Sequence, residues 1–160
     1  MVTNLRQTAS EFKYNFQYEI PVKVLAQKVG QNLQKYSQYS GIRPFCAQIT
    51  LVGIDEEFGP QCFRIDPSGQ VIGFKAVSTG SKEQEAMSQL EKQLKKLKPN
   101  EQWDGRQTVE VAITVLQAVT SSDFKSNEVE VGYINKESGV FRKLTENEID
   151  NVLTDLADKN

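Results

Sequence analysis

Residues 45–77, FCAQITLVGIDEEFGPQCFRIDPSGQVIGFKAV, predict the fold class. Their apolar and turn residues indicate three strands, at 45–55, 61–65 and 70–77. The first strand carries apolar residues on both faces, which is typical of a strand that lies between two layers. Asp66-Pro67-Ser68-Gly69 has the proline and the glycine of a type I turn. Three strands joined by such short connections predict an antiparallel meander.

Two consecutive helices are predicted before this meander. The first has apolar residues spaced by four and three positions and ends near Tyr18. The second has Pro21 in its first turn, where the missing N–H would have no partner in any case. Gly41 is the predicted end of this second helix.

Helices and a hairpin are predicted after the meander. In chain order, they are helices at 82–97 and 106–120, strands at 128–134 and 140–144, and a last helix that begins at the capping box Thr145-Glu146-Asn147-Glu148. Pro99-Asn100 ends the first of these helices. The helix at 106–120 is apolar over most of its circumference, so we expect it to be buried on more than one side. Runs of helices and antiparallel strands predict an α+β layered domain.

The composition restricts the possible functions. The 160 residues fit one domain, and the absence of histidine excludes a Ser-His-Asp triad, a Cys-His dyad and a histidine-bound zinc within this sequence. The net charge of −2 argues against a protein that binds nucleic acid by neutralising many phosphates. No apolar run could span a membrane, and the first residues lack the apolar core of a signal peptide. We therefore predict a soluble, intracellular protein.

Cys46 and Cys62 are the only cysteines and the first candidates for a nucleophile. A reactive thiol needs a lowered pKa and usually a base partner. Histidine is absent and both cysteines lie in apolar strand patterns, so we predict that both pack in the core. Their spacing does not demand a disulfide.

A Ser-Lys pair is a second conceivable source of a nucleophile. It would combine Ser68 or Ser81 with Lys75 or Lys82. Serine beside glycine is more often part of a turn, and we favour that interpretation for both serines.

Three further features could bind a ligand or a partner, and each has a structural alternative. Asp55-Glu56-Glu57 could hold a cation, but solvated charges in an exposed turn are favoured. The lysines at 92–98 could bind an acidic partner, although cations near the end of a helix also suit its dipole. Trp103 could anchor a contact or belong, with Asp104-Gly105, to the start of a helix. The glycines lack the spacing of a phosphate-binding loop, so we assign no catalytic, cofactor-binding or metal-binding residue.

The predicted sheet is incomplete. Five short strands cannot easily cover the apolar helices at 82–97 and 106–120, and the strand at 45–55 needs neighbours on both faces. We expect the missing strands to come from another segment or another subunit.

An ordered series of short motifs carries a family resemblance. The motifs are Tyr18-Glu19-Ile20-Pro21-Val22, Arg43-Pro44-Phe45, Gly53-Ile54-Asp55-Glu56, Gly59-Pro60-Gln61, Asp66-Pro67-Ser68-Gly69, Gly73-Phe74-Lys75-Ala76, Gly80, Asp123-Phe124-Lys125, Glu128-Val129-Glu130-Val131-Gly132 and Leu144-Thr145-Glu146-Asn147-Glu148-Ile149-Asp150. In this order and spacing they resemble a 20S proteasome α-type subunit over nearly the whole chain. Cys46 departs from the glycine that the family has at that position.

The resemblance implies a four-layer αββα sandwich of the N-terminal-nucleophile hydrolase type. Residues 1–160 would form a single, partial proteasome α-type domain, the C-terminal two-thirds of a longer subunit that lacks its first strands here. The incomplete sheet inferred above agrees with this expectation.

The resemblance also implies a non-catalytic, structural role. The related β subunits cut peptides with an N-terminal threonine whose amine is the base, and nothing comparable occurs at Met1-Val2-Thr3. The implied subunit belongs to the outer heptameric ring of the 20S core particle, which gates substrate access in ubiquitin-dependent protein degradation. The implied partners are the other α subunits, the β subunits and, through the assembled ring, regulatory particles, in cytoplasm and nucleus, without nucleic acid, membrane or cofactor. The helix near Met1 would face the β ring.

Two alternatives remain open at this point. A free-standing N-terminal-nucleophile peptidase would need a processed Thr, Ser or Cys at its mature N-terminus. An independent α+β protein-binding module would be a stable monomer with a complete sheet. A lone α-type fragment is instead expected to expose a sheet edge and apolar helix faces, and so to be poorly soluble or to pair with copies of itself.

Overall fold

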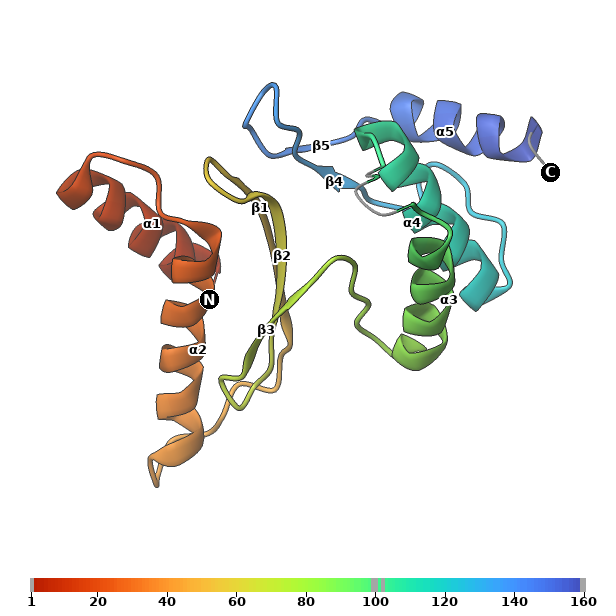
Figure 1. Ribbon diagram of the computed structural model, residues 1–160. Helices are drawn as coiled ribbons and strands as arrows, with labels where there is room; N and C mark the ends of the chain where they lie inside the picture. Colours follow the sequence, from red (N-terminus) through yellow and green to blue (C-terminus); the bar gives the residue numbers. More distant parts are fainter. Residues whose placement is uncertain (1, 99–100, 102, 159–160) are drawn as a thin grey trace. The chain divides into compact units, whose positions relative to one another are not determined.

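The computed structural model describes residues 2–98, 101 and 103–158. The chain divides into two compact units, Met1–Val77 and Ser78–Asn160, which are described in turn (Figure 1). The predicted helix end at Pro99-Asn100 and the residue Met1 lie outside the described residues.

The first unit begins with the two predicted helices, α1 (Val2–Phe16) and α2 (Val22–Gln38). Pro21 precedes α2 as its N-cap, one position earlier than predicted, and its φ of −58° suits the start of a helix. The helix ends at Gln38, and Gly41, with a φ of +87°, follows in the turn beyond it. The glycine therefore lies beyond the last helical turn rather than at its end.

The predicted meander is confirmed. Strands β1 (Ile49–Asp55), β2 (Gly59–Ile65) and β3 (Val71–Phe74) form an antiparallel sheet in the order β1-β2-β3. The first and third strands are shorter than predicted, since residues 45–48 and 75–77 are not in strands. In the turn between β2 and β3, the Gly69 amide donates to the Asp66 carbonyl at 2.8 Å, and the φ of Gly69 is +89°. Glycine adopts this left-handed conformation at little steric cost.

One face of this sheet packs on α2, which contacts all three strands (Figure 1). Ala26, Val29 and Leu33 of α2 form a buried cluster with Ile65 of β2, and half-buried side chains of α1 and of the strands surround it. Residues on the other face are more exposed. Val52 of β1 is 48% exposed, so the predicted burial of the first strand on both faces is wrong for the chain as it stands.

The second unit contains α3 (Glu83–Lys95), α4 (Gly105–Thr120) and α5 (Glu146–Asp158). The predicted burial of α4 on more than one side is confirmed. Val115 and Val119 pack with Ala86 of α3. A separate set of α4 side chains packs with α5, in a cluster made of Val109, Ile113 and Val152.

A short hairpin, β4 (Gly132–Tyr133) and β5 (Arg142–Lys143), connects α4 to α5. Its regular pairing covers less than the predicted strands at 128–134 and 140–144, and the Leu144 amide adds one further bond, to the Val131 carbonyl at 2.9 Å. The alternation is nevertheless correct, because Val131 is half-buried and Glu130 is exposed. The pattern predicts which face is covered but not how far the backbone pairing extends.

The described elements confirm the α+β class. None of the helices in the described part of the chain is both long and apolar enough to cross a membrane.

Candidate functional site

The structure places the two cysteines in different environments. Cys62 lies in β2, half-buried, opposite Val52 and Phe74 in the register, and burial raises the pKa of its thiol. A raised pKa disfavours the reactive thiolate. Cys46 is exposed, so the prediction that it packs in the core is wrong. The reason is that β1 begins only at Ile49, and residue 46 precedes the paired sheet.

Two of the residues considered for a Ser-Lys pair, Ser68 and Lys82, have structural roles. Ser68 belongs to the turn before β3, where its Oγ accepts from the Gln70 amide at 3.4 Å. The Lys82 ammonium donates to the Val119 carbonyl at 2.7 Å, in the last turn of α4. A cation at this position satisfies a carbonyl without a helical partner and suits the helix dipole. No hydrogen bond joins Ser68 or Ser81 to Lys75 or Lys82 in the part of the chain that the structure describes.

The acidic turn after β1 is organised by its own backbone. Asp55 Oδ1 accepts from the Glu57 amide at 3.0 Å, and the side chains of Glu56 and Glu57 are exposed. Such an aspartate contact is typical of a turn. Across residues 2–98, 101 and 103–158, no three His, Cys, Asp or Glu side chains gather in a way that could hold a metal ion.

The lysines at the end of α3 are partly neutralised within the helix. Lys95 pairs with Glu91 at 2.8 Å, and the Lys96 ammonium donates to Gln93 Oε1 at 3.1 Å. The hydrogen bond and charge of Lys95 lower the pKa of Glu91. These contacts agree with lysines that suit the helix end, whereas an acidic partner stays untested.

The start of α4 is a complete capping box. Asp104 Oδ1 accepts from the Gln107 amide at 2.7 Å, and the Asp104 amide donates to Gln107 Oε1 at 3.1 Å. The cap is thus Asp104, and the neighbouring Trp103 is half-buried and open to either role considered for it.

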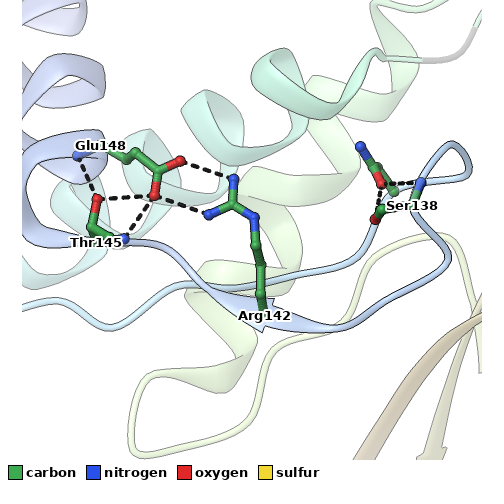
Figure 2. Close-up of polar contacts among 5 residues, drawn as sticks. Ser138, Arg142, Thr145 and Glu148 are labelled. Carbon is green, nitrogen blue, oxygen red and sulfur yellow. Dashed lines mark hydrogen bonds and ion pairs between the residues drawn. The ribbon is translucent and has the colours of Figure 1, made fainter.

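The predicted capping box of α5 is confirmed, and an arginine extends it. Figure 2 shows the Glu148 carboxylate between Thr145 and Arg142. The Thr145 amide and hydroxyl each donate to Glu148 Oε2 at 2.9 Å, and the Arg142 guanidinium donates to both carboxylate oxygens at 2.9 Å. The arginine hydrogen bonds, followed by those of Thr145, lower the pKa of Glu148 from 4.5 to about 2. The sequence analysis did not identify Arg142 as part of this cap. A basic residue three positions before a capping box is a signal that could have indicated its contact with Glu148.

This network links β5 to the N-terminus of α5 and to β4. The Arg142 guanidinium lies 5.9 Å from the centre of the Tyr133 ring, which belongs to β4. The Glu148 carboxylate accepts hydrogen bonds from both neighbours, and its lowered pKa makes it a weak base. The chemistry of this network is that of a structural clamp between a hairpin and a helix.

Exposed aromatic side chains lie at the end of α1 and just beyond it. Tyr14 is 81% exposed, and Phe16 and Tyr18 are also largely exposed. Phe12 lies under this group, with its ring centre 4.5 Å from that of Phe16 and 5.2 Å from that of Tyr18. We call Phe16 and Tyr18, whose ring centres lie 6.4 Å apart, the α1 aromatic surface. Exposed aromatic groups of this kind are typical of contact surfaces between proteins.

The comparisons with known proteins identify a family. The family model described as proteasome subunit matches residues 1–134. The chain therefore belongs to the proteasome subunit family, and the predicted family is confirmed.

Three relatives illustrate the match. The chain is 38% identical to a probable proteasome subunit alpha type-1 of Schizosaccharomyces pombe, over 99% of this chain and 64% of the relative. It is 32% identical to a proteasome subunit alpha type-6 of Caenorhabditis elegans, over 94% of this chain and 60% of the relative. It is 30% identical to a proteasome subunit alpha of Sulfolobus acidocaldarius, over 96% and 62% respectively.

Two conclusions follow from these relatives. They are all named alpha subunits, as the motifs predict. The motifs resemble alpha type-6 most, but the relatives carry several type numbers, so the type stays a prediction. The chain spans 58% to 64% of the length of these curated relatives.

Proposed function

We propose that this chain is a non-catalytic α-type subunit of the 20S proteasome core particle and acts by assembly. The observation that carries the proposal is the match to a probable alpha subunit over 99% of this chain at 38% identity. The contacts of the described residues are consistent with it, because Ser68 lies in a turn, Lys82 contacts the end of α4 and Cys62 lies in the sheet.

The complete fold in this proposal is the four-layer αββα sandwich. The exposed Val52 supports it, since an apolar side chain on the open face of a sheet is suited to a second layer. The position of β1 at the edge of its sheet also supports it, because its outer backbone groups can accept a further strand. The additional strands would come from the rest of the subunit.

Contacts with other subunits are the function of this chain in the proposal. The α1 aromatic surface is suited to the contact with the β ring, because large aromatic side chains bury much apolar area in an interface. Other α subunits would complete the heptameric outer ring. That ring would gate substrate access, receive regulatory particles and take part in ubiquitin-dependent degradation in cytoplasm and nucleus. These last roles rest on the family resemblance.

Native mass spectrometry of the tagged chain, recovered from cells of its source, tests the proposal. We expect a particle of roughly 700 kDa, the size implied by four stacked seven-membered rings of subunits in the usual domain-size range, with six other α chains and the β chains. Recovery only as a stable monomer would favour the independent α+β binding module. Peptidase activity of the purified chain, lost when its first residue is blocked, would favour the free-standing N-terminal-nucleophile enzyme.

A further inference from the structure

A groove lies along α5 in the second unit. One wall is the connection after α4, at residues 124–127, which Figure 1 shows running from α4 toward the hairpin. The other wall is α5, which contributes Glu146, Asp150, Leu153, Thr154 and Ala157. We call these residues together the α5 groove. The groove is shallow and open to solvent, with about 620 Å³ of accessible space along it, as suits a segment that lies along a surface.

The α5 residues of the groove form one stripe of the helix. They recur at intervals of three and four positions, which place side chains on the same face. Leu153 is half-buried and also packs on the cluster of α4 and α5, so its position in the groove is fixed by the core. With half-buried Phe124 on the opposite wall, it provides an apolar floor.

The charged side chains of α5 are all acidic. The helix carries five acidic residues and no basic ones in the sequence ENEIDNVLTDLAD. Two of the five are paired within the unit, Glu148 with Arg142 and Asp155 with Arg106. Glu146 and Asp150 form no ion pair with any described residue, and both border the groove.

The lysine of the groove, Lys125, forms no ion pair with either of these two carboxylates within the described part of the chain. Lys125 is the only basic residue of the groove, and the contact recorded for it is between its backbone amide and Glu128, at 2.9 Å. The position of Glu146 in the first helical turn is explained by the helix dipole, but that of Asp150, one turn later, is not. Asp150 is exposed, so its carboxylate is open to a cation of a partner.

We propose that the α5 groove binds a basic, amphipathic segment of a partner protein. An apolar side chain of that segment lies on Phe124 and Leu153, while lysine or arginine side chains pair with Glu146 and Asp150. Complementary charge sets the choice of partner, and the apolar floor distinguishes a peptide segment from a simple cation. This inference does not depend on membership of a ring.

The first test measures peptide binding by fluorescence anisotropy. The probe is a labelled 12-residue helical peptide with leucines on one face and lysines on the other, and the protein is the full chain or the assembly in which it is recovered. The double substitution Glu146→Gln, Asp150→Asn should raise Kd about three- to tenfold, the range expected for two exposed ion pairs. The matched double substitution Glu56→Gln, Glu57→Gln removes the same charge from the exposed turn of the first unit and should leave Kd unchanged. Equal effects of the two doubles would overturn the proposal, as would no measurable binding.

Two further arms examine the chemistry and the place of binding. A peptide with glutamine in place of every leucine, and spermine, should both bind at least tenfold more weakly than the probe. Equal binding of spermine would make the groove a site for simple cations and overturn the proposal. Carbodiimide cross-linking joins a carboxylate to a lysine that touches it, so the probe should be linked to Glu146 or Asp150. Cross-links confined to other acidic residues would also overturn the proposal. This holds for the chain alone and for any assembly that contains it.

Discussion

The two units of this chain are stabilised in different ways. In the first, α2 and the sheet share one continuous cluster, in which Ala26 and Ile65 are fully buried. In the second, the apolar side chains form two smaller clusters on opposite sides of α4. Its helices rely in addition on end contacts, namely the Asp104 cap, the Lys82 contact and the clamp of Figure 2.

This difference predicts which substitutions each unit should tolerate. A helix packed on a sheet loses stability when a buried side chain is shortened, because neighbouring atoms fill the space only in part. A group of helices with small clusters depends more on the hydrogen bonds and charges at the helix ends. The effects expected below therefore decrease from the buried cluster of the first unit to the exposed clamp of the second.

Ile65→Ala should have the largest effect, lowering the free energy of unfolding by about 2–5 kcal/mol. Ile65 is 0% exposed and packs on Ala26, Val29 and Leu33. Urea unfolding followed by far-UV circular dichroism measures the loss of stability. The fluorescence of Trp103, the single tryptophan, follows the unfolding of the second unit. Val140→Ala, at a side chain that is 64% exposed, is the control and should change stability by less than about 0.5 kcal/mol. Similar losses in the two variants would contradict the continuous cluster.

Gly30→Ala tests the close approach of α2 to the sheet. A Cβ at residue 30 would lie 2.6 Å from Val71 Cγ2 and 2.7 Å from the Gly69 carbonyl oxygen. We expect a loss of about 1–3 kcal/mol in urea unfolding because the helix would have to move away. Alanine is otherwise the better helix former by about 1 kcal/mol, so a more stable variant would show that the approach is loose. The exposed neighbour Gln31→Ala should have almost no effect.

Asp104→Ala removes the cap of α4 and should cost about 0.5–2 kcal/mol in the same measurement. The Gln107 amide would lose its acceptor at 2.7 Å. Asp104→Asn keeps a side-chain oxygen and should cost less. If the alanine variant lost more stability than Ile65→Ala, the order of effects drawn from the two units would be reversed.

Arg142→Met should have the smallest effect on stability and a clear effect on titration. The pKa of Glu148, about 2, lies below its ordinary value of 4.5. The ionised carboxylate is thus favoured by folding, so its contribution to stability is complete above pH 4.5 and is lost as the pH falls toward 2. Without the guanidinium, the pKa should rise toward 4.5, which an NMR titration of the Glu148 carboxyl carbon measures. Lys136→Met, in the turn of the hairpin, is the control and should leave the pKa of Glu148 unchanged. If Lys136→Met raised this pKa as much as Arg142→Met, the result would argue against the two hydrogen bonds between Arg142 and Glu148.

Local sequence patterns predicted the elements of this fold well. Helical spacing located α1 to α5, Asp66-Pro67-Ser68-Gly69 predicted the turn between β2 and β3, and Thr145 to Glu148 predicted the cap of α5. These signals depend on neighbours within a few positions, which the sequence displays directly. The limits of the strands were less certain, as at residue 45, because backbone pairing depends on a partner strand that is distant in the chain.

Tertiary structure decided what each side chain meets. The sequence by itself determined the absence of histidine, the α+β pattern and the ordered motifs of the family, since all three are properties of residue identity and spacing. It could not place Cys46 outside the sheet or bring Lys82 to the end of α4. The groove along α5 likewise needs residues 124–127 beside a helix that begins at Glu146. Burial and pairing between distant residues arise only when the chain has folded, because they depend on distances in space that no local pattern encodes.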